Sequence, residues 1–387
     1  MEILPRTLGT RPRLACEVRA EGVVAARAED ASAVLSAVVR VPLEDGVAVP
    51  HLRTGEAGVT VASGIGNSAA NGIVGGVTGG AAGRAKLVTA LRSALEQVCV
   101  RTREVTVVVP DAAVRVLLMD FDSLPGKKAE AIPLLRFRLK KLVAFDVEDT
   151  AISYQVVPSV TGLRLLVAVS PGPVMREYEA IVREAGFEPG IVMTSSLACL
   201  GMLSDDAPAL IVYASTQSVT TAITRGQELL LHRTQELPWQ PEQLAETVEP
   251  SGYTEVVTTV ESADGSVAEA IGFAETPAVL DLTADEPVPD AVDAAGVQTF
   301  LDPAADPIET ELQHAVTVAA AFYEDAIGRP AQPVLVSGAM DARTWHSLLG
   351  HDEIALRDLV SSEDMGTAME SGLSRAQLGA VCGALRG

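Results

Sequence analysis

The sequence lacks the features that define several classes of protein. Its four cysteines are far apart, with no CxxC pair and no Cys/His spacing typical of zinc, so neither a disulfide scaffold nor a structural zinc site is predicted. We expect Cys16, Cys99, Cys199 and Cys382 to be buried thiols of a reducing cytoplasm. The segment from Met1 to Arg13 contains no apolar run typical of a secretory signal.

No segment is predicted to span a membrane. The one uncharged stretch long enough to do so, 59–83, contains eight glycines together with Asn67, Ser68, Asn71 and Thr78. A spanning helix consists mostly of large apolar residues, and each glycine costs a helix up to about 1 kcal/mol. The stretch therefore predicts a surface loop. It contains no GxxxxGKS/T motif, which excludes a P-loop there.

Basic residues are scarce and unevenly placed. Lys and Arg total 29 against 51 Asp and Glu, a net charge of −22, which argues against a nucleic-acid partner. All five lysines lie between Lys86 and Lys141, whereas 234–328 contains twenty Asp and Glu and no Lys or Arg. Such a segment repels itself, so we expect a solvated, partly irregular insertion over 236–310. An acidic docking surface for a basic partner is the alternative.

The chain is long and apolar enough to bury a core. It has 387 residues, 48% of them hydrophobic, which allows two or three domains. Predicted strands occupy 14–20, 23–27, 105–109, 115–121, 152–157, 163–169 and 334–338, and 209–233 predicts a meander of three strands, two within 209–224 and one at 229–233. Predicted helices occupy 86–98, 133–143, 174–185, 311–326 and 375–385. This order predicts an α/β fold in which 86–190 forms a compact α+β module.

The order of these parts is that of actin-like ATPases: an N-terminal hairpin, a second hairpin rich in glycine and hydroxyls, and a late strand ending in glycine. Four stretches make the resemblance more specific, namely REVTVVVP at 103–110, VLLMDFDSLP at 116–125, LRFRLKKLVAF at 135–145 and YQVV at 154–157. They resemble PilM, a family of cytoplasmic proteins that assemble type IV pili. YEDAIGRP at 323–330 and GALRG at 383–387 are similar to the late helix and C-terminus of that family.

The resemblance implies an actin-like (ribonuclease H-like) fold of two halves with an inserted subdomain. The first half would occupy 1–85, with a glycine-rich loop at 55–83. The inserted α+β subdomain, named 1C in the family, would occupy 86–190. The second half would occupy 191–387 and include the acidic segment 236–310, and its C-terminal helix is expected to return to the first half.

The first phosphate-binding motif of actin-like proteins, D-x-G, is altered in this chain. The matching residues are Glu17, Val18 and Arg19. The carboxylate is kept, but an arginine replaces the glycine that lets the backbone approach a phosphate. In the second motif Tyr213 stands where an aspartate would hold metal-bound water. We therefore predict that this chain does not hydrolyse ATP.

Residual nucleotide binding is the alternative. The hydroxyls of Ser215, Thr216 and Ser218 would donate to phosphate, and Glu17 and Gly338 would complete a degenerate site. Such hydroxyls more often cap turns or pair across a hairpin. We expect no cofactor, with ATP and magnesium disfavoured. No metal or other catalytic site is predicted, because the five histidines lack HExxH spacing and no GxSxG accompanies a plausible triad.

The predicted helix at 133–143 has an aromatic side chain opposite its apolar face. At 100° per residue, one stripe is formed by Ile132, Leu135, Leu139 and Leu142. Phe137 points away from it, among the cations Arg136, Arg138, Lys140 and Lys141. This arrangement predicts a peptide-docking spot, with packing of Phe137 on a neighbouring subdomain as the alternative. Pro133 would lie in the first turn, or kink the helix if it begins near Gly126.

The altered motifs predict a function without catalysis, and the resemblance implies what that function is. The chain would be a platform protein at the cytoplasmic face of the inner membrane, held there by its partners. It would bind the cytoplasmic tail of a PilN-like membrane protein and contact other platform components of the pilus machinery. The alternatives are an active or nucleotide-switched ATPase of the same fold, a GspL-like scaffold of type II secretion, and a filament protein of the FtsA type.

Overall fold

The computed structural model describes most of the chain outside the acidic segment. The described residues are 12–29, 34–44, 47, 49–55, 58–62, 80–159, 162–203, 207–237, 306–350, 354–366 and 371–386. They belong to one compact unit, and 240–305 is assigned to a second unit. The predictions for 63–79 and for nearly all of 236–310 lie outside the described residues.

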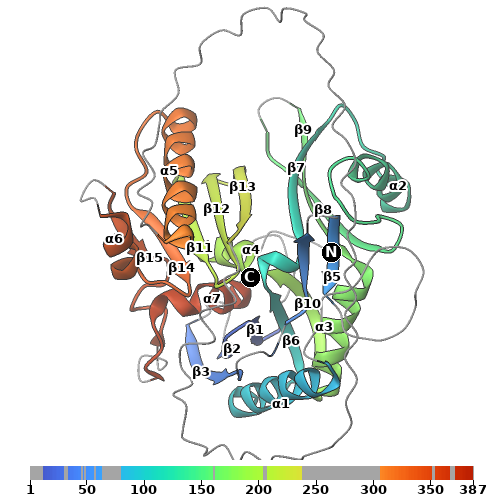
Figure 1. Ribbon diagram of the computed structural model, residues 1–387, viewed down its shortest axis with the longest axis vertical. Helices are drawn as coiled ribbons and strands as arrows, with labels where there is room; N and C mark the ends of the chain where they lie inside the picture. The colour runs from blue at the N-terminus through green and yellow to red at the C-terminus, as the bar shows by residue number, and fades with distance from the viewer. Residues whose placement is uncertain are drawn as a thin grey trace, which may run out of the picture. The chain divides into compact units, whose positions relative to one another are not determined.

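The first half is built on a five-stranded sheet of order β3-β2-β1-β6-β10 (Figure 1). Its strands are β1 (Leu14–Arg19), β2 (Gly22–Ala28), β3 (Leu35–Pro42), β6 (Glu104–Val109) and β10 (Glu188–Thr194). The first three form an antiparallel meander, β6 runs parallel to β1, and β10 runs parallel to β6. Helices α1 (Gly80–Val98) and α3 (Gly172–Glu184) bury their apolar faces with this sheet.

The second half repeats this arrangement with the strand order β13-β12-β11-β14-β15. Its strands are β11 (Ala209–Ala214), β12 (Ser218–Arg225), β13 (Glu228–Glu236), β14 (Val334–Gly338) and β15 (Leu356–Asp358). Again three strands form an antiparallel meander and the last two run parallel to the first. Helices α5 (Pro307–Ile327) and α6 (Ala342–Leu349) share its apolar core. Two sheets with this order and these directions are the two-half actin-like fold, so the predicted fold class is confirmed.

A separate three-stranded sheet of order β7-β9-β8 is inserted in the first half. It contains β7 (Arg115–Phe121), β8 (Thr150–Val157) and β9 (Leu163–Pro171), and helix α2 (Lys128–Leu139) shares its core. The inserted sheet thus lies within 115–171. The predicted module at 86–190 is too wide, because α1, β6, α3 and β10 pack and pair with the sheet of the first half.

A short hairpin occupies the start of the predicted glycine-rich loop. Strand β4 (His51–Gly55) pairs with β5 (Gly58–Ala62), and α1 begins at Gly80, six residues before the helix start expected from the apolar spacing. The prediction of a loop over 55–83 is therefore wrong at both of its ends. Glycines contribute no apolar periodicity, so the pattern of Leu87, Leu91 and Leu95 could not reveal the first turn of α1.

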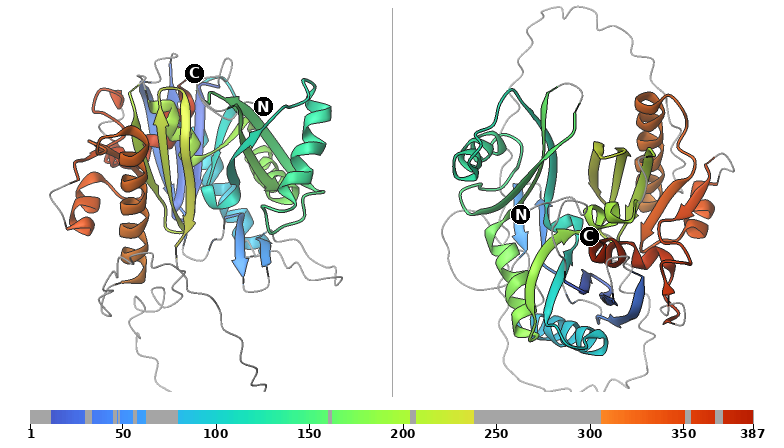
Figure 2. Two further views of the ribbon diagram at one scale, coloured as in Figure 1. Left: turned by 90° about the horizontal axis from the view of Figure 1, so that it is seen from above. Right: turned by 180° about the vertical axis from the view of Figure 1, so that it is seen from behind.

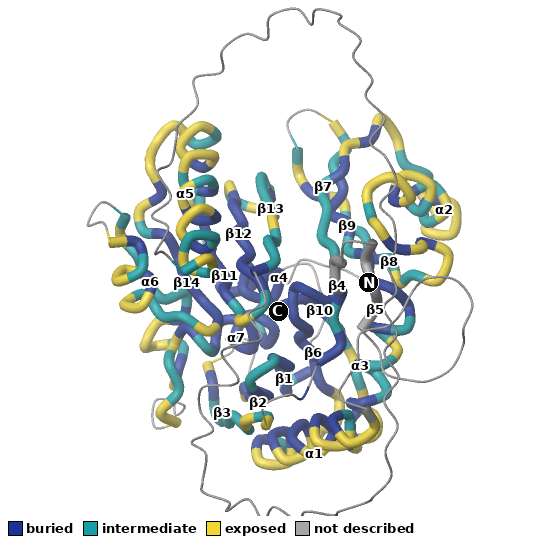
Figure 3. The backbone as a smooth tube through the Cα atoms, in the orientation of Figure 1, coloured by how far each residue is buried: buried dark blue, intermediate teal, exposed yellow. Residues whose placement is uncertain are grey.

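One apolar core joins the two halves. Helices α4 (Ser195–Cys199) and α7 (Gly379–Leu385) pack against each other and against residues of both five-stranded sheets. Figure 1 shows α7 between the two sheets, and the dark red segment at the C-terminus has the same place in the right-hand view of Figure 2. The inner strands of both five-stranded sheets are buried, whereas the outer sides of α1 and α5 are exposed (Figure 3). Of the four free cysteines, three are buried as predicted, and Cys99 is half-buried.

Candidate functional site

The alternation of side chains along β1 and β11 brings Glu17 and Tyr213 together. On β1, Leu14, Cys16 and Val18 face α1, so the other side of the strand faces the second half. On β11, Tyr213 belongs to the core shared by both halves. These are the positions at which sequence analysis expected two aspartates, and their side chains meet.

The carboxylate of Glu17 is fully buried and receives three hydrogen bonds. The Tyr213 hydroxyl donates to Oε1 at 2.5 Å, the Ser195 hydroxyl donates to the same oxygen at 2.8 Å, and the Arg19 guanidinium pairs with Oε2. We call Glu17, Arg19, Ser195 and Tyr213 the Glu17 cluster. It joins the first strands of both halves to the start of α4.

Burial and the charge of Glu17 determine the protonation of Tyr213 and Arg19. Burial raises the pKa of Tyr213 well above its usual range, and the Glu17 charge raises it further, so the phenol keeps the proton that it donates. Burial alone would lower the pKa of Arg19, but the Glu17 carboxylate outweighs this and raises it. Arg19 Nη2 also donates to the backbone carbonyl of Gln377 at 2.6 Å. The carboxylate therefore interacts with side chains of its own protein.

The remaining predicted nucleotide residues serve the hairpin and the sheet. The hydroxyl of Ser215 donates to the Ser218 carbonyl at 3.1 Å and accepts from the Ser218 N–H at 3.0 Å, while Thr216 is exposed. Gly338 has φ +103°, and a Cβ there would lie 1.9 Å from the carbonyl oxygen of Ala214. In the described residues no hydrogen bond links Glu17 to these three hydroxyls.

A second buried polar group adjoins the Glu17 cluster. Ser196 donates its hydroxyl and its backbone N–H to Asp111 at 2.8 and 3.1 Å, and this hydroxyl lies 2.8 Å from Nε2 of His232. Burial raises the pKa of Asp111 and lowers that of His232 to about 4. Because the Ser196 hydroxyl donates to Asp111, and the histidine is not held by a carboxylate, this is no activated nucleophile.

The five residues predicted to dock a partner lie on α2 and just after it. Phe137 is 66% exposed, so the alternative of packing on a neighbouring subdomain is wrong. Two of the four cations around Phe137 interact with other residues of the inserted subdomain. Arg138 donates to the Asp120 carbonyl at 2.6 Å and covers the ring of Phe121, and Lys140 pairs with Glu148 at 2.7 Å. Arg136 and Lys141 complete the set.

Helix α2 spans Lys128–Leu139, so it begins and ends earlier than the predicted range 133–143. The alternative of a start near Gly126 is confirmed, because Pro133 lies inside the helix and not in its first turn. Leu135 and Leu139 are fully buried, but Leu142 follows the end of the helix and is 56% exposed. The predicted stripe is therefore correct for its first three positions and wrong for Leu142, because the 3.6-residue period no longer applies after Leu139.

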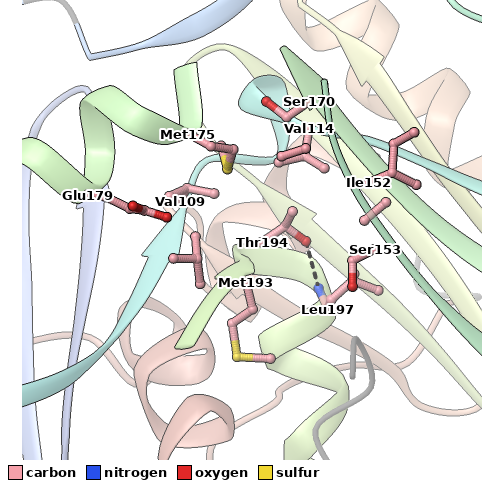
Figure 4. Close-up of a pocket in the computed structure, with 13 residues that line it drawn as sticks. Val109, Val114, Ile152, Ser153, Ser170, Met175, Glu179, Met193, Thr194 and Leu197 are labelled. Carbon is pink, nitrogen blue, oxygen red and sulfur yellow. Dashed lines mark hydrogen bonds between the residues drawn. The ribbon is translucent and has the colours of Figure 1, made fainter. Parts of the chain in front are cut away.

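A cavity of about 180 Å³ lies between the inserted sheet and the first half (Figure 4). Its walls are the ends of β6 and β10, the start of α4, one side of α3, and strands β8 and β9. The lining is mostly apolar, and its polar groups are all oxygens, from Ser153, Ser170, Glu179 and Thr194. We call it the junction cavity. Sequence analysis named none of these lining residues.

The junction cavity and the predicted docking helix are on different sides of the inserted sheet. On β9, Leu165, Val167 and Val169 pack in the core that α2 shares, whereas Ala168 and Ser170 line the cavity. Alternate residues of a strand point to opposite faces. The structure therefore does not bring Phe137 into the junction cavity.

The site residues that sequence analysis missed come from segments with weak local signals. Ser195 and Ser196 follow β10, whose Pro189 and Gly190 lie at a shift in pairing register and hide the strand. The one local sign is Thr194, which caps α4 by accepting the N–H of Leu197 at 3.4 Å (Figure 4). Their partners lie at positions 17, 111 and 232, so only the fold brings them together.

Comparison with known proteins supports the fold. No protein-family model and no curated protein matches the sequence. A solved structure described as "PilM-PilN type IV pilus biogenesis complex" is similar at 14% sequence identity and a TM-score of 0.61, covering 97% of this chain and 98% of that one. The described part of this chain thus has the fold of that structure, and the PilM-like fold expected from the sequence is confirmed.

Two further solved structures are less similar. One is the cytoplasmic domain of EpsL, an inner-membrane component of the type II secretion system of Vibrio cholerae, with 11% identity, a TM-score of 0.36, and 62% of this chain and 78% of that one covered. The other is the ethanolamine utilization protein EutJ from Carboxydothermus hydrogenoformans, with 9% identity, a TM-score of 0.40, and 100% and 94% covered. At these TM-scores neither carries an argument about this chain.

The described residues contain neither a candidate membrane span nor a candidate metal cluster. None of the helices there combines the length and apolar character needed to cross a membrane. Nor do three or more His, Cys, Asp or Glu side chains of that part of the chain gather as a metal site would require.

Proposed function

We propose that this chain is a non-catalytic platform protein of type IV pilus assembly, and that it binds the cytoplasmic tail of a PilN-like inner-membrane protein. The observation that carries the proposal is the likeness, over 97% of the chain, to a structure described as a complex of PilM with PilN. The partner would hold the chain at the cytoplasmic face of the inner membrane, where it would contact other platform components.

The junction cavity is the site that we propose for the tail. Its apolar lining suits one or two apolar side chains, and the oxygens of Ser153 and Thr194 suit the backbone N–H groups of a peptide. The cavity also lies beside two strands at sheet edges, since β8 ends the order of the inserted sheet and β10 ends that of the first sheet. An extended peptide can add to such an edge by backbone hydrogen bonds.

The Glu17 cluster supports the proposal that the chain is not an enzyme. Glu17 already holds hydrogen bonds from Tyr213 and Ser195 and the charge of Arg19. A bound magnesium–phosphate group would have to displace a buried guanidinium and leave its charge unpaired, which is costly. ATP and magnesium are accordingly not proposed as cofactors.

The test is to fill the junction cavity. Ala168→Leu places a larger apolar side chain at a residue of β9 that lines it, and Val156→Leu enlarges an exposed residue of β8 that does not. Binding of a synthetic N-terminal tail of a PilN-like protein is measured by isothermal titration calorimetry. We expect Ala168→Leu to weaken binding at least about tenfold, the equivalent of about 1.4 kcal/mol, and Val156→Leu to leave the affinity within about twofold.

Phe137→Ala separates the junction cavity from the docking helix. Because α2 lies across the inserted sheet from the cavity, we expect this variant to bind the tail as the wild type does. Loss of binding in Phe137→Ala with normal binding in Ala168→Leu would move the site to α2. No saturable binding by the wild-type chain would contradict the proposed function itself.

A further inference from the structure

A second cavity, of about 830 Å³, lies in the second half and has four arginines in its walls. These are Arg329, Arg357, Arg375 and Arg386. Arg329 follows α5, Arg357 lies on β15, Arg375 begins the short helix before α7, and Arg386 follows α7. The volume is within the range of about 300–1,000 Å³ typical of ligand sites. We call it the arginine-lined cavity; the proposed function makes no use of it.

Two of the four guanidinium groups are held in place by carboxylates. Arg375 lies 3.1 Å from Asp358, which also accepts the N–H of Ala342 at 2.9 Å, and Arg386 pairs with Asp364. An arginine has five N–H donors, so an ion pair through one nitrogen leaves donors for a ligand. These two side chains are thus oriented in advance.

The other two arginines are exposed to the cavity and carry unpaired charge. No carboxylate of the described chain forms an ion pair with Arg329 or Arg357, and a single further acidic side chain, Glu363, lines the cavity. Two unpaired arginines beside two fixed ones form a local positive surface in an acidic protein.

We infer that the arginine-lined cavity binds an acidic peptide segment of a partner protein. The charges come from four separate segments, which suits carboxylates spread along a chain, and arginine pairs well with carboxylate. Apolar residues such as Leu203, Pro330 and Leu359 also line the cavity, are at least partly exposed, and suit the apolar side chains of a peptide. The nearby start of α6, a place where a phosphate would bind, is already capped by Asp341 and Asp358.

The test uses the full-length chain and a fluorescent twelve-residue peptide of alternating glutamate and leucine, with lysine replacing glutamate in the control peptide. Binding is followed by fluorescence anisotropy at about 0.15 M salt, where exposed charges interact over about 8 Å. The double variant Arg329→Gln/Arg357→Gln removes the two unpaired charges. Arg233→Gln/Arg343→Gln is the matched control, since it removes two exposed arginines of the same half outside the cavity.

We expect saturable binding of the acidic peptide alone, weakened about tenfold in Arg329→Gln/Arg357→Gln and less than twofold in the control variant. Equal weakening in both double variants would mean that net charge, not the cavity, attracts the peptide, and would overturn the inference. So would binding of inorganic pyrophosphate, but not of the peptide, that depends on Arg329 and Arg357. An affinity that rises when 240–305 is deleted would assign the cavity to the acidic stretch of the chain itself.

Discussion

The side chain of Glu17 is one of the places where hydrogen bonds join the two halves, and its charge is paired with that of Arg19 inside the protein. A buried carboxylate is tolerated when it is paired and its oxygens are hydrogen-bonded, and removal of one partner leaves a charge that water cannot reach. The second half offers a natural comparison. There Arg225 ends β12 and pairs with Glu228 at 2.7 Å, but the arginine is 44% exposed.

Arg19→Ala is therefore expected to cost about 3–5 kcal/mol of the free energy of unfolding. Arg225→Ala, which breaks the exposed pair, is expected to cost less than about 1 kcal/mol. Urea denaturation of both variants measures the difference. Similar small losses of the free energy of unfolding in both variants would show that Arg19 does not stabilise the buried carboxylate of Glu17.

His232 predicts a dependence of stability on pH. Burial lowers its pKa from the ordinary 6.5 to about 4, so below pH 6.5 the unfolded chain takes up a proton that the folded chain does not. The contribution of His232 to the free energy of unfolding does not change above pH 6.5, and it decreases as the pH falls from 6.5 toward 4. Asp111, whose pKa is raised, has the opposite effect, so the wild-type curve alone is not diagnostic.

The diagnostic quantity is the difference between the wild type and His232→Gln, which keeps a polar side chain beside Ser196. As the pH falls from 6.5 to 4, we expect the wild type to lose stability relative to the variant. Chemical denaturation at a series of pH values gives this difference. A difference that does not change with pH would mean that His232 is protonated in the folded chain as it is in water.

At the scale of single elements, α2 separates a structural face from an exposed one. Leu135 is fully buried against the inserted sheet, and Phe137, two residues later, is exposed. We expect Leu135→Ala to cost about 2–5 kcal/mol and Phe137→Ala to change stability by less than about 0.5 kcal/mol. Thermal unfolding followed by circular dichroism measures both. A comparable loss in Phe137→Ala would mean that its ring is packed.

Elements with strong local patterns were predictable from the sequence. Strand β7 begins and ends where the run of apolar residues between Arg115 and Phe121 predicts, and β14 ends at the glycine that the sequence marks. Strands β3, β4, β5, β10 and β15 were missed. Strand β3 has a mixed burial pattern, Pro189 and Gly190 interrupt β10, and β15 has three residues, too few for any period.

At the scale of the whole molecule, the sequence predicted which residues of the phosphate-binding motifs are altered. It did not predict the contacts that the altered residues make. Glu17, Arg19 and Tyr213 were identifiable because each departs from a known motif. Their hydrogen bonds to one another, to Ser195 and to the Gln377 carbonyl join residues up to 358 positions apart, and no local pattern encodes such contacts. The junction cavity has the same origin, since its walls come from both the first half and the inserted sheet.

The nucleotide prediction belongs to the whole molecule, because a bound nucleotide would contact both halves at once. A ligand that binds only the folded chain stabilises it by about 2.7 kcal/mol at a hundred times its Kd. We expect no saturable stabilisation by ATP with magnesium, because the Glu17 carboxylate is held by Arg19 and Tyr213. Differential scanning calorimetry over a range of ATP concentrations tests this, and turnover is followed by phosphate release.

The variant Arg19→Gly/Tyr213→Asp gives this experiment a positive comparison. It restores the glycine and the carboxylate of the two motifs and places two buried carboxylates side by side, which repel each other unless a cation lies between them. We expect the variant to be less stable than the wild type without ligand and to gain stability with magnesium and ATP. Saturable stabilisation of the wild type by ATP and magnesium to the same extent would contradict the interpretation that Arg19 and Tyr213 keep the Glu17 carboxylate from binding magnesium. Measurable ATP turnover would show that the chain is an enzyme.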